Sequence, residues 1–420
     1  MDSDSRFVTG LDIGTENVRA VVATINAKGE VSVRGYNEGK SAGMRKGVPA
    51  NLAGPGGAID NMLIEVERMS GYEVHNAYVS VGGSQILSTK VEGMIAVGPT
   101  EHEIVDADLD RIESIAVTSR VLQNRDILDV IPLQYALDGQ SGIKDPIGMS
   151  GSRLEMWANV ISALTPNCEN LKKATSDVEV HADRLIPGVV AAAEAVLTDR
   201  QKENGVAVID LGAATTSVAV YEEGDLQYVG VIPAGSNNVT NDLAIVLAID
   251  PDMAEEIKTR FVTGDFTTEK SPVIKIGREG KSERNFDRKE VDEVVKARLD
   301  EIFSEVRKKL KSAKYDQRLP EGIVLTGGGA RMRDIDLFAK HALEAAVKIG
   351  VPQGLGGVSD AIERPEYATA VGLALIAAKS APASSSSSKK KLKLKKPAKS
   401  SSAKPSRNPL SLIKNLFSKF

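Results

Sequence analysis

Two stretches of the chain share one pattern of apolar and polar positions. The segments VTGLDIGTENVRAVVATINAKGEVSV, from Val8, and VAVIDLGAATTSVAVYEEGDLQYV, from Val206, each contain an apolar run, a short glycine-containing turn and a second β-branched run. A turn at residues 27–29 or 222–224 then precedes a third run. This pattern predicts a three-stranded antiparallel meander in each segment. Its recurrence predicts two related lobes.

Apolar periodicity predicts further elements outside the two repeats. Residues 285–314 place apolar side chains at helical spacing and predict one long helix on the second lobe. Residues 106–122 predict an amphipathic helix, and GIVLTGGGARMRDIDLFAKHAL predicts a strand, a third glycine turn and a helix that begins near Met332. The material that we assign to an insertion between the repeats contains expected strands at 77–83 and 89–98 and an expected strand pair at 152–164.

Composition places the chain among intracellular multidomain proteins. A chain of 420 residues exceeds one hydrophobic core. The single cysteine, Cys168, excludes a disulfide framework and fits a reducing compartment. The N-terminal MDSDSRFVTG lacks the apolar region of a secretory signal, and no apolar run reaches the roughly 18 residues of a membrane span. We expect a cytoplasmic protein.

The last part of the chain differs from the rest in charge. Eleven of the 53 Lys and Arg residues and none of the 57 acidic residues lie from Lys389 to Phe420, which leaves 42 bases against 57 acids elsewhere. Residues 380–408, rich in Ser, Lys and Pro, predict a disordered basic linker. An acidic body with a basic tail indicates an anionic partner for the tail.

Residues 409–420 predict an amphipathic helix that lies on a membrane surface. At 100° per residue, every apolar side chain falls on one face and every polar one on the other. The helix is about 16 Å long, which is too short to span a bilayer but suits its surface. Docking on a protein and binding to nucleic acid are the alternatives, and the scarcity of Arg and interleaved aromatics disfavours nucleic acid. The expected membrane-facing residues are Leu410, Leu412, Ile413, Leu416, Phe417 and Phe420.

The turns of the two repeats have the chemistry of a nucleotide site. Each apolar strand ends in an aspartate, Asp12 or Asp210, next to a glycine turn. Such turns present backbone N–H groups to phosphate, and an aspartate at a strand end can hold Mg²⁺ through its water shell. The TGGGA stretch adds a third glycine surface, expected at a helix start where phosphate or ribose is favoured. Three such turns in this order predict a site for a nucleoside triphosphate.

The order of these motifs resembles that of the actin, Hsp70 and sugar-kinase superfamily. Within it, residues 7–379 resemble the FtsA family of bacterial cell-division proteins, through RFVTGLDIGT, VTNDLA, GIVLTGGGARM and YATAVGLALIA. The resemblance implies an α/β, actin-like two-lobed ATPase fold with an FtsA-type inserted 1C subdomain and a disordered tail that ends in an amphipathic helix. The implied domains are the first lobe (1A) at 6–80 and 166–204, the 1C subdomain at 81–165, the second lobe (2A) at 205–250 and 319–358, the 2B subdomain at 251–318, a helix returning to the first lobe at 359–379, the linker at 380–408 and the terminal helix at 409–420.

The same resemblance implies the residues that bind ATP and Mg²⁺. Asp12 and Asp210 are the expected metal residues, acting through water. The expected ATP-binding residues are Asp12, Gly14, Thr15, Glu16 and Asn17 in the first turn; Asp210, Gly212, Ala213, Ala214, Thr215 and Thr216 in the second; Gly327, Gly328, Gly329 and Ala330 at the adenosine; Glu255 and Lys258 at the ribose or base; and Gly372 at a hinge.

Two departures from the superfamily pattern bear on activity. The second turn has Ala213 and Ala214 where glycines are usual, and alanine resists positive φ, so weaker phosphate binding is expected. Relatives with fast hydrolysis place Glu or Gln before the helix that leads into the second repeat, whereas residues 185–193 contain no carboxylate or amide. Without a group that positions water we expect at most slow ATP hydrolysis, and no catalytic residue is assigned.

The function implied by the resemblance is that of a scaffold. It would polymerise with itself at the division site, on the cytoplasmic face of the membrane, bind anionic lipids and other division proteins, and anchor filaments of the tubulin-like FtsZ through the 2B region. We expect no nucleic-acid partner. The alternatives are a PilM-like pilus-assembly adaptor and a small-molecule kinase or ATPase of the same fold.

Overall fold

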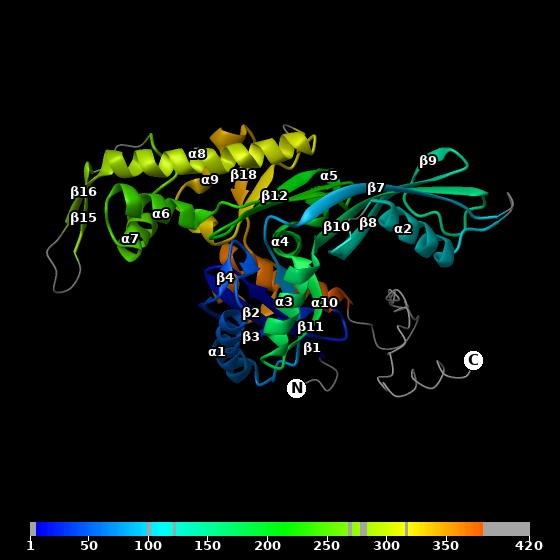
Figure 1. Cartoon of the computed structure of the whole chain (residues 1–420), viewed down its shortest axis with the longest axis horizontal. Coiled ribbons are helices and arrows are strands. Elements are labelled where there is room, and N and C mark those ends of the chain that lie inside the picture. Colours follow the sequence, from blue (N-terminus) through cyan, green and yellow to red (C-terminus); the bar gives the residue numbers. More distant parts are fainter. Residues whose placement is uncertain are drawn as a thin grey trace, which may run out of the picture. The chain divides into compact units, whose positions relative to one another are not determined.

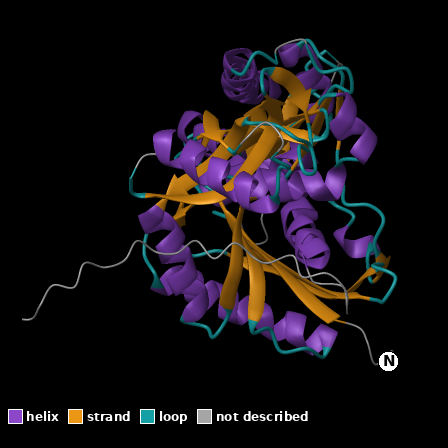
Figure 2. Ribbon diagram, turned by 90° about the vertical axis from the view of Figure 1, so that its right-hand side faces the viewer, coloured by secondary structure: helices purple, strands orange, loops and turns teal. Residues whose placement is uncertain are grey.

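The computed structural model describes residues 6–98, 102–120, 123–267, 271–277, 284–315 and 318–380. Two mixed sheets carry the two sequence repeats, and a third, antiparallel sheet lies between them in sequence. Helices pack against these sheets (Figure 2). The predicted linker at 380–408 lies, apart from Ser380, outside the described residues, and so does the whole of the predicted helix at 409–420.

The first repeat forms half of a six-stranded sheet with the order β11-β6-β1-β2-β3-β19. The meander β1-β2-β3 is antiparallel, and β6 and β11 extend it as parallel strands on the other side of β1. The strands are β1 (Arg6–Ile13), β2 (Asn17–Ile25), β3 (Val31–Lys40), β6 (Asn76–Val81), β11 (His181–Pro187) and β19 (Gly356–Gly357); the helices beside them are α1 (Ala53–Ser70), α3 (Thr165–Ser176), α4 (Gly188–Val196) and α10 (Ala368–Ser380).

The second repeat forms a sheet of matching topology, with the order β14-β13-β12-β17-β18. Here too an antiparallel meander is continued by two parallel strands. Glu223 and Gly224 connect β13 to β14 with φ of 54° and 79°, as a type I′ turn requires. The prediction of two related lobes is confirmed. The strands are β12 (Val206–Leu211), β13 (Thr216–Glu222), β14 (Asp225–Ile232), β17 (Ile323–Thr326) and β18 (Val347–Ile349); the helices are α5 (Asp199–Asn204), α6 (Ser236–Val246), α7 (Pro251–Phe261), α8 (Arg288–Ser312) and α9 (Ile335–Leu343).

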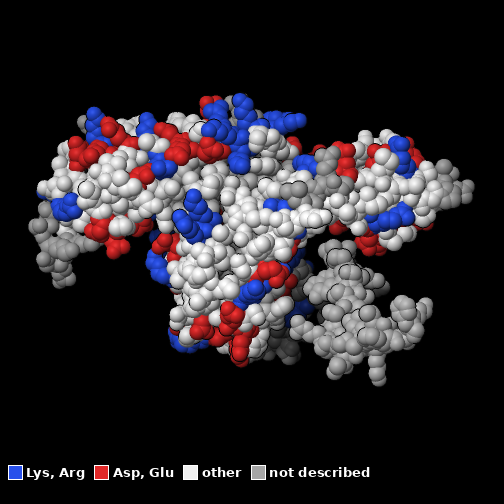
Figure 3. Space-filling view, viewed as in Figure 1, with Lys and Arg blue, Asp and Glu red and all other residues white. Residues whose placement is uncertain are grey.

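The long helix of the second lobe is α8 (Figure 1). Asp287 caps it by accepting a hydrogen bond from the Lys289 N–H at 2.9 Å. Its apolar stripe is buried, while its outer face carries interspersed acidic and basic side chains (Figure 3). The predicted start at 285 is wrong by three residues, because β16 (Arg284–Asp287) pairs with β15 (Val273–Ile276) immediately before the helix.

The insertion is an antiparallel sheet, β7-β10-β8-β9, with α2 packed against it. The predicted strand pair at 152–164 is one strand, β10, which pairs along its length with β7 and β8. Residues 158–163 are all buried and contain no Gly or Pro, so nothing interrupts the strand. The predicted strand at 77–83 also differs, because it is β6 and belongs to the first lobe. The elements are β7 (Leu87–Ala96), α2 (Asp106–Arg120), β8 (Arg125–Leu137), β9 (Gln140–Ile143) and β10 (Arg153–Leu164).

Short elements complete the described part of the chain. A small hairpin of β4 (Met44–Arg45) and β5 (Val48–Pro49) follows the first meander. Three 3₁₀ turns are η1 (Gly328–Arg331), η2 (Asp360–Ile362) and η3 (Pro365–Tyr367). No helix within the described ranges is both long and apolar enough to cross a membrane.

Candidate functional site

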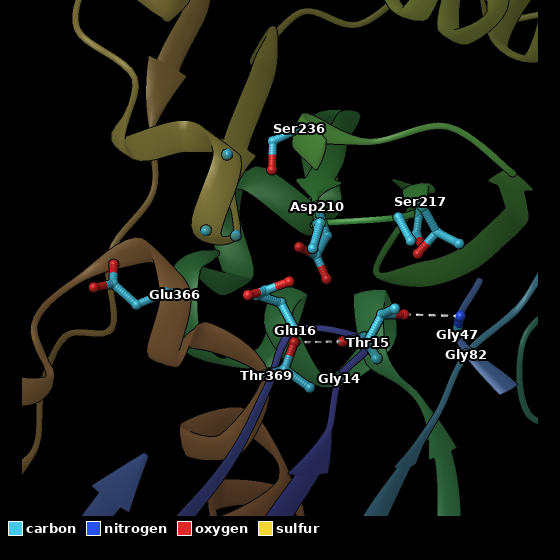
Figure 4. A pocket seen from close by; sticks show the side chains of 18 of the residues that line it. Gly14, Thr15, Glu16, Gly47, Gly82, Asp210, Ser217, Ser236, Glu366 and Thr369 are labelled. Atoms are coloured by element: carbon cyan, nitrogen blue, oxygen red, sulfur yellow. Dashed lines mark hydrogen bonds between the residues drawn. The ribbon is translucent and has the colours of Figure 1, made fainter. Parts of the chain in front are cut away.

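A cavity of about 340 Å³ lies where the strand ends of the two lobes meet (Figure 4). Most of the predicted ATP-binding residues line it, although the two halves of the set are far apart in sequence. The predicted residues that line the cavity are Asp12, Gly14, Thr15, Glu16, Asn17, Asp210, Gly212, Ala213, Ala214, Thr215, Glu255, Lys258, Gly327, Gly328 and Gly329.

The two turns have the same backbone hydrogen bond. The Gly14 N–H donates to the Asn17 carbonyl at 3.1 Å, and the Gly212 N–H donates to the Thr215 carbonyl at 3.0 Å. Each turn therefore closes over two residues and directs their backbone N–H groups away from the strand pair. Paired turns of this kind offer an anion donors from both lobes.

Ala213 and Ala214 do not strain the second turn. Both alanines have negative φ, so the expected penalty for replacing glycine does not arise, and the expectation of weakened phosphate binding loses its physical basis. Within the described part of the chain, the N–H groups of both alanines have no acceptor. They remain available to a ligand.

Two half-buried aspartates, Asp12 and Asp210, line the cavity. Burial raises the pKa of Asp210 to about 7, and the negative charge of Asp12 adds to the rise. Burial also raises the pKa of Asp12, although Arg19 and Ser80 oppose it. Two carboxylates held together away from water gain most from a divalent cation. The described residues contain no cluster of three or more acidic, His or Cys side chains suited to a metal.

The glycine-rich stretch from Gly327 is shaped by Asp210. Gly327 has a φ of 87°, and a Cβ added there would lie 2.1 Å from the Asp210 Oδ1 atom. The predicted helix start near Met332 is wrong, because a single 3₁₀ turn, η1, is followed by α9 only at Ile335. Asp334 interrupts the helical path with a φ of 57° and accepts a hydrogen bond from the Thr263 hydroxyl at 2.6 Å. The third glycine surface therefore lies at a 3₁₀ turn and not at the expected helix start.

A third group of polar atoms comes from α7. The Lys258 ammonium is buried and lies 2.6 Å from the Glu255 Oε2 atom. It also donates to the Thr240 hydroxyl at 2.9 Å, and that hydroxyl donates to Glu255 at 2.6 Å. Three mutual hydrogen bonds fix the pair at the wall of the cavity.

Three predicted residues do not line the cavity. Thr216 is buried and its hydroxyl donates to the Ala234 carbonyl at 2.8 Å. Ala330 belongs to the core of the second lobe. Gly372 lies in the crossing of α10 and α4, where an added Cβ would be 1.7 Å from the Ala191 carbonyl oxygen. These residues support the site from behind.

Sequence reasoning missed several residues of the lining, namely Gly47, Ser80, Gly82, Ser236, Asn237, Glu366 and Thr369. Ser80 accepts a hydrogen bond from the Ile13 N–H at 2.9 Å, and the Gly47 N–H donates to the Thr15 hydroxyl at 3.0 Å. The sequence carries a signal for Ser80 and Gly82, since β6 ends in VSV beside β1 and two glycines follow it. Because the predicted strand at 77–83 is assigned to the insertion, its residues are not expected at the cavity.

The start of α4 contributes no acid or amide to the cavity. Pro187, Gly188 and Val189 line it at this point. Glu194, the first acid further along the helix, forms ion pairs with Lys202 at 2.7 Å and with Lys379. Slow hydrolysis stays a prediction.

Two lobes of like topology, each with an aspartate and a glycine turn at one cavity, define the actin-like class of fold. The PilM–PilN type IV pilus biogenesis complex has this fold, with a TM-score of 0.66 and 16% identity over 88% of this chain and 98% of that chain. MreB5 of Spiroplasma citri bound to ADP gives a TM-score of 0.51 and 14% identity over 87% of this chain and 94% of that chain.

Sequence comparison identifies the family within this class. The family model described as cell division protein FtsA matches residues 207–372, and that of the SHS2 domain inserted in FtsA matches residues 83–162. Cell division protein FtsA of Pseudomonas aeruginosa is 33% identical over 374 residues, 88% of each chain. That of Escherichia coli K12 is 31% identical over 380 residues, 88% of this chain and 90% of the relative. The chain belongs to the FtsA family of cell-division proteins.

Proposed function

We propose that this protein is a nucleotide-loaded scaffold that attaches division filaments to the cytoplasmic face of the cell membrane. The observation that carries the proposal is the cavity between the two repeats, which the half-buried pair Asp12 and Asp210 lines. Membership of the FtsA family places this cavity in a cell-division protein. In this role the bound nucleotide defines the state of the scaffold and is not a substrate for rapid turnover.

The nucleotide of the proposal is ATP with Mg²⁺. The N–H groups of the two turns receive the phosphates, and Asp12 and Asp210 hold the cation through water. Gly327, Gly328 and Gly329 approach the adenosine, while Glu255 and Lys258 contact the ribose or base. A solved MreB5 of the same fold is described as bound to AMPPNP, which supports this choice. Because no acid or amide from α4 reaches the cavity, bound ATP turns over slowly.

The filament partner is FtsZ, which docks through its C-terminal peptide on the 2B region, residues 251–318. A second hollow there is lined by Arg260, Arg288 and Arg333, together with Asp265 and Asp334. The Arg288 guanidinium donates to the Phe261 carbonyl at 2.8 Å, which holds it at the edge of the hollow. Three guanidiniums around one hollow suit an acidic peptide segment.

Attachment to the membrane falls to residues 409–420. Leu410, Leu412, Ile413, Leu416, Phe417 and Phe420 enter the headgroup region, and the lysines of the linker meet anionic lipid. One short helix binds weakly, so homopolymers hold the membrane through many linked copies. Other division proteins join the same assembly.

The nucleotide proposal is tested by titrating the full-length protein with ATP and Mg²⁺ in a calorimeter. We expect binding to one site per chain, lost when Asp210 and Asp12 are both replaced by Asn. If the wild-type protein gives no heat of binding, or if the double variant gives the same heat of binding as the wild type, the assignment is contradicted. The likeness to the PilM–PilN complex, with a TM-score of 0.66 at 16% identity, shows the fold alone and does not favour a pilus-assembly adaptor.

A further inference from the structure

One side-chain hydrogen bond joins the first glycine turn to the opposite lobe. Glu16 follows Thr15 in the turn after β1, and its Oε2 atom accepts a hydrogen bond from the Asn237 side-chain amide at 2.9 Å. Asn237 is the second residue of α6 in the second lobe. Both residues line the nucleotide cavity, and the Glu16 carboxylate extends into it (Figure 4).

Each end of this bond is anchored in its own lobe. The backbone carbonyl of Glu16 accepts from the Ser41 N–H at 2.9 Å, and its Oε1 atom lies 2.8 Å from the Lys40 ammonium. The Asn237 N–H donates to the Ala213 carbonyl at 2.8 Å, which ties it to the second turn. The bond therefore breaks when the lobes separate or when the Glu16 or Asn237 side chain rotates away.

The bond lies at the mouth of the cavity. The Glu16 side chain is 45% exposed and that of Lys40 is 79% exposed, whereas Asp12 and Asp210 are half-buried. Hydrogen bonding from Lys40 lowers the pKa of Glu16, and the Asn237 amide contributes in the same direction. Glu16 is thus ionised at neutral pH and makes a charge-assisted hydrogen bond to Asn237.

We propose that Glu16 and Asn237 form a latch across the mouth of the nucleotide cavity, which opens whenever a nucleotide enters or leaves. This inference rests on the proposed function, because it assigns a gate to that same site. A latch raises the barrier in both directions. Because the phosphates are received by the backbone N–H groups of the turns, loss of the Glu16 side chain removes the latch and no proposed ATP contact. Its loss therefore speeds association and release together and changes the dissociation constant little, whereas loss of a direct ligand contact mainly speeds release.

The test is stopped-flow kinetics of a fluorescent ATP analogue with Mg²⁺, on the full-length protein. Glu16→Ala and Asn237→Ala, one variant from each lobe, are each expected to raise the association and release rate constants about fivefold, the scale of one half-exposed charge-assisted hydrogen bond. The double variant is no faster than either single variant, because all three lack the same bond. Lys40→Gln, which leaves the Asn237 bond in place, stays within about twofold of the wild-type rates.

Three results would overturn the latch. They are unchanged rate constants in both single variants, faster release with unaltered association, and multiplied effects in the double variant. Far-ultraviolet circular dichroism and melting temperatures verify that each variant is folded, and the two single variants give independent readings from the two lobes. If the wild-type protein binds no nucleotide at all, both the proposed site and the latch are wrong. If it binds nucleotide and the variants keep its rate constants, only the latch is wrong.

Discussion

At the scale of single residues, the cavity depends on close contact between backbone and carboxylate. Gly327 leaves no room for a side chain beside Asp210, whereas a Cβ on Gly328, the next residue, would meet nothing within 4 Å. The two glycines are neighbours in sequence but differ in what surrounds them. They therefore form a matched pair for substitution.

Gly327→Ala is expected to weaken binding of ATP with Mg²⁺ by at least about tenfold, because the methyl group would displace Asp210 and strain a positive φ. Gly328→Ala is expected to lose less affinity than Gly327→Ala, because its methyl group meets no protein atom and can crowd only the bound adenosine. Calorimetric titration measures both. Equal losses in the two variants would show that the whole turn, rather than the contact with Asp210, sets the affinity.

The raised pKa of Asp210 predicts a pH dependence of stability. Above pH of about 4 the unfolded chain has lost the proton that the metal-free folded protein keeps on Asp210 up to about pH 7. The contribution of Asp210 to the free energy of unfolding therefore falls between these values, by at most about 1.4 kcal/mol per pH unit, and then levels off. Urea unfolding of the wild-type protein and of Asp210→Asn, both without metal, measures the difference between their free energies of unfolding at each pH. A difference that stays constant from pH 5 to pH 7 would contradict the assignment.

The residues of the site form two groups. Some lie at strand ends within the repeated pattern, and the others reach the cavity only through the packing of the lobes. Asp12, Asp210 and the glycines of the turns follow strand ends within a repeated pattern, and the sequence therefore predicts them. Asn237 and Glu366 come from α6 and η3, which reach the cavity only through the packing of the lobes. No local pattern marks such positions. For the same reason Gly372, expected at a hinge, lies in a helix crossing.

At the scale of elements, α10 and α4 approach each other so closely that a glycine is required. We expect Gly372→Ala to lower the free energy of unfolding by about 1–3 kcal/mol, because its methyl group would collide with the Ala191 carbonyl. Gly57→Ala, in the exposed face of α1 with nothing within 4 Å, should instead raise it by about 0.5–1 kcal/mol through helix propensity. Urea denaturation separates the two. A Gly372 variant as stable as the wild type would contradict the observed crossing.

Whether a segment is a helix or a strand follows from the spacing of its apolar residues. Where that helix or strand begins and ends depends on its contacts with other elements. The stripe of α8 predicts a long helix, but pairing of β15 with β16 decides where it starts. The third glycine turn predicts a helix close behind it, and Asp334 delays that helix to Ile335. The long run at 152–164 lacks a turn, so it continues as the single strand β10. These differences arise from contacts that a one-dimensional pattern does not contain.

At the scale of the whole molecule, the insertion is held to the second lobe by a buried amide. The Asn159 side chain on β10 donates to the Leu226 carbonyl on β14 at 2.9 Å and accepts from the Ser88 hydroxyl at 2.7 Å. Asn159→Ala is expected to cost about 1–3 kcal/mol of unfolding free energy, because it leaves a buried carbonyl unpaired. The exposed Asn61→Ala, measured by the same urea titration, should change it by less than about 0.5 kcal/mol. Equal effects would contradict the role of Asn159.

The two-lobed architecture itself is predicted from the sequence, because a repeated meander specifies a repeated sheet. The mutual placement of insertion and second lobe is not predicted, since it rests on pairs such as Lys90 and Gln227, which are joined at 3.0 Å across 137 positions of sequence. Residues 409–420 lie outside the described part of the chain. Their role in membrane attachment thus remains a proposal from the sequence.

The scaffold proposal joins filament binding to membrane attachment, and one reconstitution measures both. FtsZ filaments are sedimented with anionic liposomes, ATP and Mg²⁺, in the presence of the full-length protein, of a chain that ends at Lys379, or of the full chain with Ile413→Glu and Phe417→Glu. We predict that the full-length protein carries FtsZ into the liposome fraction and that both altered chains leave it in the filament fraction. Equal recovery of FtsZ with liposomes for all three proteins would contradict the account.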